Sequence, residues 1–345
     1  MKLFTPHWGS TSVKLADLLK SQEKQDLVYS TYALHLSVSE KLKTNDFAET
    51  LAKRVLTSAR KWLSGLPQYE LTLLSKLVDA GPNNFVEEPN LSTLNMLRLS
   101  SMIICEDCSY ERESRRFMIC DELREAIAPY VHVELHSEKN ARRFVFEKYV
   151  LGLMNLYGAV NAIDLFDLLS DFSREETTDE MIMTKAFDKS FFLHQCIIGE
   201  KLAAKPIMFS FVSPYLLDYN SLMESMDKHS ELEDLKSFSE EEVCAAGDIL
   251  SPQVPCPYNN ALKEYLVTHL ACSEIQASNM ILMFWYSIQK EETDLSSLIY
   301  TLVEDKPHPD DLQELMTLFI NYSNHSPRWY LNGYSPNEIK ELNKN

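Results

Sequence analysis

Two cysteines at the spacing of a zinc half-site are the residues of this sequence best suited to metal chemistry. Cys105 and Cys108 form a C-x2-C pair, and Cys120, His132 and His136 follow. Zinc binds thiolates and imidazoles in a tetrahedron, so the pair needs a second pair at a suitable distance. The interval from Cys108 to His132 is longer than in zinc fingers and contains an expected strand and an expected helix. We therefore expect buried, reduced thiols, with Cys105 and Cys108 as metal candidates only and with no cofactor.

No pattern for nucleophilic or phosphate-transfer chemistry occurs in the sequence. There is no G-x-S-x-G, H-E-x-x-H, Walker-type glycine loop or G-x-G-x-x-G. Carboxylates are frequent, but they lie in runs such as EDCSYERE (106–113) and SREETTDE (173–180), which are typical of solvated turns. We therefore expect a protein that is not an enzyme.

Positive charge is concentrated in the first 65 residues. The whole chain has a net charge of −18, yet residues 1–65 carry ten Lys and Arg against six Asp and Glu, and the rest carries 23 against 45. Such an asymmetry indicates a module that faces polyanions, and a chance run of solvated lysines is the alternative. The candidate nucleic-acid-binding residues of this module are Lys41, Lys43, Lys53, Arg54, Arg60 and Lys61.

The elements that would carry these cations are two helices. Apolar spacing predicts helices over 16–36 and 45–66, with a short polar loop between them. Asn45 is an expected cap, and Gly65 is an expected stop. Lys53 and Arg60 are seven residues apart, and so are Arg54 and Lys61. The two members of each pair should therefore lie on the same side of the second helix.

A repeated order of elements follows this basic unit. Helices are predicted over 69–81 and 90–101, a β-hairpin over 102–120 and a helix over 121–130. The order then recurs, with helices at 144–158, 161–172 and 178–187, a hairpin at 191–212, and a helix at 213–226 capped by Ser213. Helices followed by a hairpin and a capped helix are typical of winged-helix units. The expected fold class is mainly α (α+β), with two winged-helix-like units.

Winged-helix units often bind DNA, so the charge of the expected helices and wings matters. The helices at 90–101 and 178–187, which would enter a groove, are poor in Lys and Arg. The first wing has three arginines with interleaved acids, namely Arg112, Arg115 and Arg116. We include these three as nucleic-acid candidates and keep open that the winged-helix units only pack or bind protein.

The last third of the chain is predicted to be all-helical and to end in a structural segment. A capping box at Ser239–Glu242 opens it, and Ser335–Glu338 forms another before a last helix. Gly333 permits a left-handed turn, and the indole of Trp329 can anchor the preceding turn as a buried apolar group. The structural residues expected here are Trp329, Gly333, Ser335 and Glu338.

Several of these segments carry a family resemblance. The pattern N-x4-W-x3-G-x2-P-N-E at 324–338 resembles the end of a group of uncharacterised bacterial cytoplasmic proteins, many of which continue into a zinc-binding SEC-C tail. The stretches 117–127, 152–160 and 238–248 resemble that group too. The chain ends at Asn345 without such a tail, so the resemblance implies no zinc site. Residues 34–56 are similar to the SAP and Rho N-terminal helix-loop-helix, which implies nucleic-acid binding.

These observations predict four domains and two alternative functions. The domains are 1–65, 66–142, 143–235 and 236–345. The protein should bind DNA or RNA, or act as a regulator, through its basic N-terminal unit; alternatively, its acidic helical C-terminal half is an adaptor for a basic protein partner. Seven cysteines without a secretory signal, and no apolar run long enough to span a bilayer, predict a cytoplasmic protein without membrane contact.

Overall fold

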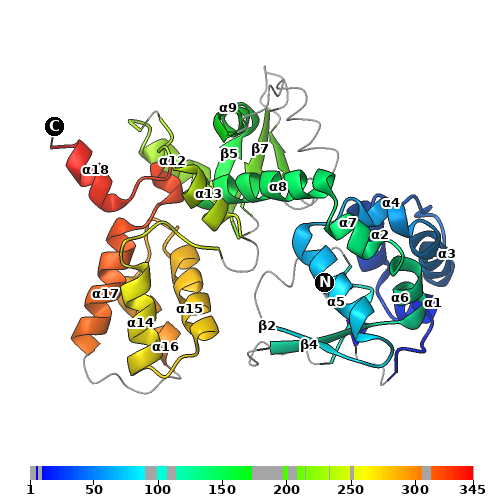
Figure 1. The fold of residues 1–345 in the computed structure, drawn as a ribbon. Coiled ribbons are helices and arrows are strands. Elements are labelled where there is room, and N and C mark those ends of the chain that lie inside the picture. Colours follow the sequence, from blue (N-terminus) through cyan, green and yellow to red (C-terminus); the bar gives the residue numbers. More distant parts are fainter. Residues whose placement is uncertain are drawn as a thin grey trace. The chain divides into compact units, whose positions relative to one another are not determined.

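The chain forms two compact units, which are mainly helical and contain two small sheets (Figure 1). The computed structural model describes residues 5–6, 10–89, 99–106, 114–172, 197–200, 208–213, 215–232, 234–248, 252–304 and 312–344. Among the described residues, those up to Phe146 belong to the first unit and those from Glu147 onward belong to the second. The finer boundaries near residues 65, 142 and 235 stay predictions.

Several helices of the first unit are shorter than the sequence pattern suggested, whereas the helix predicted over 69–81 is found at Gln68–Ala80. The helices of this unit are α1 (Leu15–Lys20), α2 (Lys24–Ala33), α3 (Thr44–Thr57), α4 (Ala59–Leu63), α5 (Gln68–Ala80), α6 (Asp121–Ile127) and α7 (Val131–Leu135). The single helix expected over 16–36 is wrong, because the Ser21 hydroxyl donates a hydrogen bond to the Leu18 carbonyl at 2.7 Å and α1 ends there. The helix expected over 45–66 is also broken, at Ser58, whose φ of −115° and ψ of 20° lie outside the helical range.

The break at Ser58 turns α4 back onto α3. The buried indole Nε1 of Trp62 donates a hydrogen bond of 2.9 Å to the Val55 carbonyl, which fixes the second helix on the first. The start of α3 also differs from the prediction, because its N-cap is Lys43 and not Asn45. Phe47, Leu51 and Val55 recur at helical spacing on the inner face of α3 and are fully buried.

The first sheet contains the hairpin that the sequence predicted. Its strands are β1 (Thr5–Pro6), β2 (Val86–Pro89), β3 (Ile103–Cys105) and β4 (Ser114–Ile119), in the order β1-β3-β4-β2. β3 and β4 are antiparallel, with Ile103 opposite Ile119 and Cys105 opposite Phe117, so the predicted hairpin is confirmed. β1 and β2 were not predicted. The helix expected over 90–101 lies largely outside the described residues.

The sheet of the second unit repeats the arrangement of β2, β4 and β3 in the first sheet, without a counterpart of β1 among the described residues. β5 (Ala159–Asn161), β6 (Ile197–Glu200) and β7 (Met208–Val212) are ordered β5-β7-β6, and all pairs are antiparallel. In both sheets, the strand after a long helix (β2 or β5) pairs with the second hairpin strand (β4 or β7). The helix predicted over 178–187 lies outside the described residues.

The helix predicted over 213–226 starts later than expected. The structure has α12 (Tyr219–Lys228), and the side chain of Asp218 caps it by accepting a hydrogen bond from the Ser221 amide. Ser213 is buried instead, and its hydroxyl donates to Asn155 Oδ1 at 3.0 Å. The sequence did not distinguish the two candidate caps, because Asp218 and Ser213 both precede apolar residues. The Ser213 hydroxyl is used in the contact with Asn155, and Asp218 caps the helix.

The remaining helices lie in the predicted segments, except that the first of them begins at Glu138 rather than at residue 144. They are α8 (Glu138–Tyr157), in which the unit boundary falls, α9 (Ala162–Phe172), α13 (Glu240–Ala246), α14 (Asn259–His269), α15 (Glu274–Ser287), α16 (Leu295–Val303), α17 (Leu312–His325), the 3-10 helix η2 (Trp329–Leu331) and α18 (Pro336–Leu342). Ser239 forms the predicted capping box with Glu242. In the described part of the chain, we find no helix with the length and apolar character needed to cross a bilayer.

Candidate nucleic-acid interface

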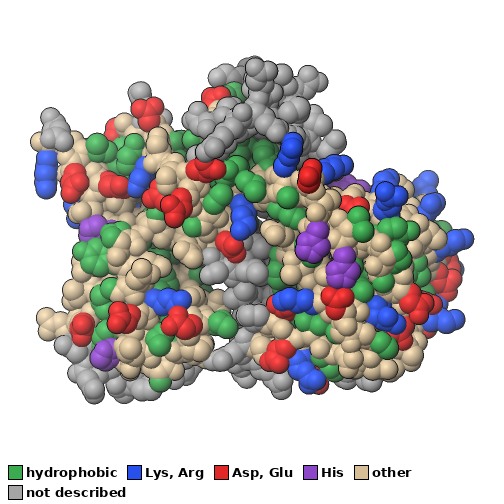
Figure 2. Space-filling model, in the orientation of Figure 1, with side chains coloured by type: hydrophobic (Ala, Val, Ile, Leu, Met, Phe, Trp, Pro, Cys, Tyr) green, Lys and Arg blue, Asp and Glu red, His purple; other side chains and the backbone are tan. Residues whose placement is uncertain are grey.

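Six predicted cations lie on the surface of the first unit, and we call them the basic edge: Lys41, Lys43, Lys53, Arg54, Arg60 and Lys61. Two of them are in the loop between α2 and α3, two are near the end of α3, and two are on α4. All six side chains are exposed. Figure 2 shows Lys and Arg side chains along the surface of α3 and α4.

The six cations of the basic edge have no carboxylate partner among the described residues. Other cations of the described chain do form ion pairs, including Lys20 with Glu49 at 2.6 Å and Lys148 with Asp248 at 3.1 Å. Free Lys and Arg side chains at a surface can neutralise phosphates without first breaking an internal pair. The basic edge is therefore available for an anionic ligand.

The predicted single-helix stripe of cations is wrong, because the cations lie on two helices. Lys53 and Arg54 belong to α3, whereas Arg60 and Lys61 belong to α4 beyond the break at Ser58. Their relative placement depends on the hydrogen bond from Trp62 to Val55 rather than on the seven-residue spacing.

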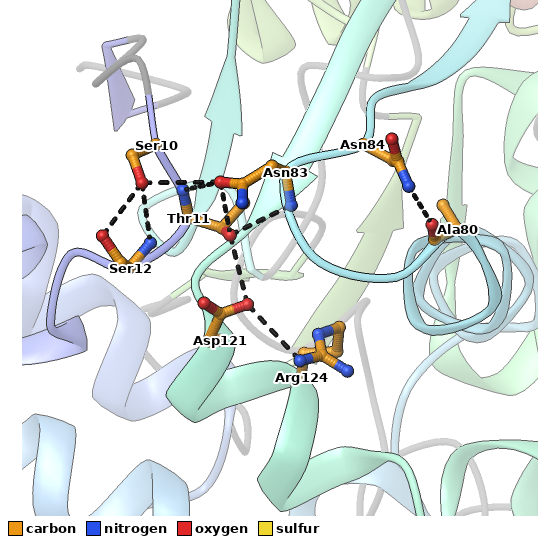
Figure 3. Close-up of polar contacts among 8 residues, drawn as sticks. All are labelled: Ser10, Thr11, Ser12, Ala80, Asn83, Asn84, Asp121 and Arg124. Atoms are coloured by element: carbon orange, nitrogen blue, oxygen red, sulfur yellow. Dashed lines mark hydrogen bonds and ion pairs between the residues drawn. The ribbon is translucent and has the colours of Figure 1, made fainter.

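A buried threonine links segments of the first unit that are far apart in the sequence (Figure 3). The Thr11 carbonyl accepts a hydrogen bond of 2.9 Å from the Asp121 amide at the start of α6, and its hydroxyl lies 3.1 Å from Asp121 Oδ1. Asn83, in the loop after α5, accepts from the Thr11 amide at 3.1 Å through its Oδ1 and donates its own amide to the Thr11 hydroxyl. Asn83 has a φ of +57°, and this left-handed turn brings both of its groups to Thr11. The N-terminal segment is thereby tied to α5 and α6.

The three arginines of the predicted wing are placed differently from the basic edge. Arg112 lies outside the described residues. Arg115 is 2% exposed, on the inner face of β4, so its guanidinium is not part of the surface. Arg116 is exposed, but its Nη1 lies 2.6 Å from Glu106 Oε2 and its guanidinium lies 4.3 Å from the centre of the Phe85 ring. We therefore leave the wing out of the interface.

Arg115 belongs to a buried ionisable cluster between α5 and the sheet. Glu88 lies opposite it on β2, and Glu70 and Tyr69 face the same region from α5. Burial raises the pKa of the Tyr69 hydroxyl, the carboxylates of Glu88 and Glu70 raise it further, and the Arg115 charge opposes them. Lys76 also donates a hydrogen bond to Glu88. The positive charge of Arg115 and the carboxylates of Glu70 and Glu88 therefore lie together inside the fold.

The cysteines carry no sign of a metal site within the described residues. Cys105 is 1% exposed in β3, and Cys108 lies outside the described part of the chain. Burial raises the pKa of the Cys120 thiol to about 11, which keeps it protonated and unreactive at neutral pH. Among the residues that the structure describes, no three His, Cys, Asp or Glu side chains are arranged to hold a metal ion.

One constellation that the sequence did not reveal has the connectivity of a catalytic relay. The Ser75 hydroxyl lies 3.1 Å from His132 Nδ1, and His132 Nε2 lies 3.0 Å from Asp79 Oδ1. The exposure is the reverse of what catalysis needs, because the Ser75 nucleophile is buried whereas the Asp79 side chain is 63% exposed. We interpret it as a tie between α5 and α7. No sequence pattern indicated this contact, because Ser75 and His132 are 57 residues apart.

The four predicted structural residues lie together at the closing segment, residues 324–338 of the second unit. Trp329 is 3% exposed, and its indole Nε1 donates to the Asn155 carbonyl at 2.7 Å. Gly333 has a φ of +85°, and a Cβ there would lie 2.8 Å from the Tyr157 ring. Ser335 and Glu338 form the capping box of α18. The buried Ser326 hydroxyl, in the same segment, donates to the Tyr322 carbonyl at 2.6 Å.

Three of the segments that carry the family resemblance pack against one another through glycines. A Cβ on Gly247 would lie 1.8 Å from the Lys148 carbonyl oxygen, and one on Gly152 would lie 2.0 Å from the Val243 carbonyl oxygen. α8 and α13 therefore approach each other at backbone distance. A Cβ on Gly158 would lie 2.4 Å from the Trp329 ring. The glycines of these three segments therefore lie at the contacts between helices and the closing segment of the second unit.

Comparison with known proteins gave no match to a family model, to a curated protein or to a solved structure. The function must therefore be argued from the geometry and charge of this chain alone.

Proposed function

We propose that this protein binds nucleic acid, without catalysis, through the basic edge. The observation that carries the proposal is that its six cations are exposed and have no ion-pair partner among the described residues. Phosphate contacts by such residues supply most of the affinity of non-specific nucleic-acid binding. Residues 34–56, which are similar to a nucleic-acid-binding helix-loop-helix, hold only the loop and α3, because α2 ends at Ala33, so the proposal rests on the charges of the basic edge.

The charge of the rest of the chain should make this binding weak. Residues 1–146 carry 19 Lys and Arg against 19 Asp and Glu, whereas residues 147–345 carry 14 against 32. Repulsion from an acidic unit acts over a Debye length of about 8–10 Å at physiological salt. The basic edge therefore gives the chain a local polyanion site within an acidic protein.

We also propose that each of the two small sheets belongs to a winged-helix-like unit. In each sheet a strand that precedes the hairpin (β2 or β5) pairs with the second hairpin strand (β4 or β7), and in the first sheet β1 also pairs in parallel with β3. The burial of Arg115 and the ion pair of Arg116 favour a packing role for the first of these units. In this proposal the winged-helix-like units are scaffolds and not DNA readers.

The second candidate function is an adaptor that binds a basic protein through the acidic unit. The excess of 32 Asp and Glu over 14 Lys and Arg in residues 147–345 favours it. Exposed apolar side chains on helices of that unit would add contact area, such as Met283 at 60% and Tyr300 at 54% exposure. This candidate makes no use of the basic edge.

Salt-dependent binding of the full chain to labelled DNA and RNA tests the first function. With about three to five phosphates contacted, a plot of log K against log salt should have a slope of about −3 to −4.5. The variant Lys41→Glu/Lys43→Glu/Lys53→Glu/Arg54→Glu should lose binding in fluorescence anisotropy at low salt.

The control changes the same total charge elsewhere. Lys139, Lys290, Lys340 and Lys344 are also exposed and lie outside the basic edge. Their combined change to Glu should weaken binding far less than the change at the basic edge. Equal losses in the two variants, or no binding by the wild type, would favour the adaptor function instead.

A further inference from the structure

A half-exposed aromatic ring stands beside the basic edge. Tyr32, near the end of α2, is 51% exposed. Its hydroxyl donates a hydrogen bond of 2.6 Å to Glu40 Oε1, from the loop that carries Lys41 and Lys43. The ring is therefore fixed to the same loop as two of the cations.

That loop is itself fastened to α2. Lys24 Nζ donates a hydrogen bond of 2.6 Å to the Glu40 carbonyl, and the Leu36 amide donates to the Thr31 carbonyl at 2.8 Å. Leu34 is 2% exposed and anchors the start of the loop in the core. The loop thus holds Tyr32 and its lysines in a defined arrangement before any ligand arrives, which reduces the entropy lost on binding.

We propose that the basic edge takes single-stranded nucleic acid, with a base stacked on Tyr32 and the adjoining phosphates on Lys41 and Lys43. The inference rests on the proposed function and specifies its ligand. Proteins that bind single strands combine a positive surface with aromatic rings on which bases stack. In a duplex both faces of each base are already stacked, so Tyr32 could add nothing there.

The local charges agree with this ligand. Glu40 is the acid closest to the ring, and its carboxylate is engaged by the Tyr32 hydroxyl. Lys24, on α2, donates to the Glu40 carbonyl, and Lys41 and Lys43 follow Glu40 in the same loop. The hydroxyl is needed only to orient the ring, so a phenylalanine should preserve most of the stacking.

The experiment compares the full-length wild type with Tyr32→Ala and Tyr32→Phe, using a labelled 15-nucleotide DNA strand and the duplex of the same sequence. Stacking of one base is worth about 1–3 kcal/mol, so Tyr32→Ala should weaken single-strand binding about 5- to 150-fold and leave duplex binding within about twofold. Tyr32→Phe should stay close to the wild type. Tyr300→Ala is the matched control, because Tyr300 is 54% exposed in the other unit.

Other outcomes separate this inference from the proposed function. Tighter duplex binding by the wild type, or equal losses for both ligands in Tyr32→Ala, would overturn the single-strand inference and leave the basic edge intact. Absence of binding to both ligands, or full binding by the charge-reversed basic edge, would overturn the proposed function as well. Circular dichroism melts of each variant exclude unfolding as the cause of a loss. A photo-cross-link from a 5-bromodeoxyuridine strand to the peptide containing residue 32 should form in the wild type and in Tyr32→Phe and should be lost in Tyr32→Ala.

Discussion

The indole Nε1 of Trp329 donates a hydrogen bond of 2.7 Å to the backbone carbonyl of Asn155, across 174 residues of sequence. The carbonyl lies near the end of α8, and the Asn155 side chain bonds at the same time to Ala246 and Ser213. One asparagine thus joins α8, α13, the strand end after β7 and the closing segment. We expect the stability of the second unit to depend on this contact.

Substitution of Trp329 should lower the free energy of unfolding in two measurable steps. Trp329→Ala removes a buried aromatic group, and the expected cost is about 3–5 kcal/mol. Trp329→Phe keeps most of the apolar contact but leaves the Asn155 carbonyl without its donor, at about 1–3 kcal/mol. Urea denaturation measures both. A melt of the Ala variant that coincides with the wild type would contradict the anchoring role.

Gly158 and Trp329 should be energetically coupled. Gly158 has a φ of +74°, and a Cβ there would lie 2.4 Å from the indole ring. Gly158→Ala should therefore cost more than the roughly 1–2 kcal/mol of a left-handed alanine alone. In the Trp329→Ala background the clash disappears, so a double-mutant cycle should give a coupling energy of about 0.5–3 kcal/mol. Simple additivity would show that the ring moves away freely.

Glu338 should make the closing segment sensitive to acid. Burial raises the pKa of its carboxyl, but hydrogen bonds from Lys236 Nζ at 2.7 Å and from the Ser335 amide at 2.8 Å outweigh this and lower it. Because the folded-state pKa is depressed, the stabilisation is present above the unfolded value of 4.5 and is lost as the pH falls through the folded value. Glu338→Gln should therefore destabilise the protein at pH 7, and its difference from the wild type should shrink as the pH falls below 4.5.

Two variants of the same segment complete that test. Ser335→Ala should cost about 0.5–2 kcal/mol, the usual value of an N-cap. Glu341→Gln is the control, because Glu341 is exposed on the same helix. A stability difference between Glu338→Gln and wild type that persists unchanged at pH 3 would show that the carboxylate charge is not responsible.

The sequence predicted the elements whose determinants are local. The β3–β4 hairpin, the helices after residue 238 and the capping boxes at Ser239 and Ser335 all follow from spacing and cap residues that lie within a few positions. β1 was missed because two residues carry no pattern, and its partner β3 is about 100 residues away. The breaks after α1 and at Ser58 were missed because no Gly or Pro marks them.

The candidate site was predictable in residue type but not in burial. The exposed lysines of the basic edge followed from charge alone. Arg115 and Arg116 are adjacent and chemically identical, yet the strand pairing places one inside and the other outside. Only the register of β4 on β2, which depends on the tertiary fold, assigns Arg115 to Glu88 and thereby removes it from the surface.

Arg115 and Arg116 give a prediction that separates a structural role from a binding role within one strand. Arg115→Met removes a buried charge beside Glu70 and Glu88, which are 2% and 6% exposed, so it should cost about 3–5 kcal/mol. Arg116→Met removes the same charge from an exposed pair and should cost at most about 1 kcal/mol. Urea denaturation should resolve this difference. Because we place nucleic acid on the basic edge, Arg116→Met should also bind a single strand within about twofold of the wild type. A folded Arg116→Met protein that has lost binding would mean that the wing belongs to the interface after all.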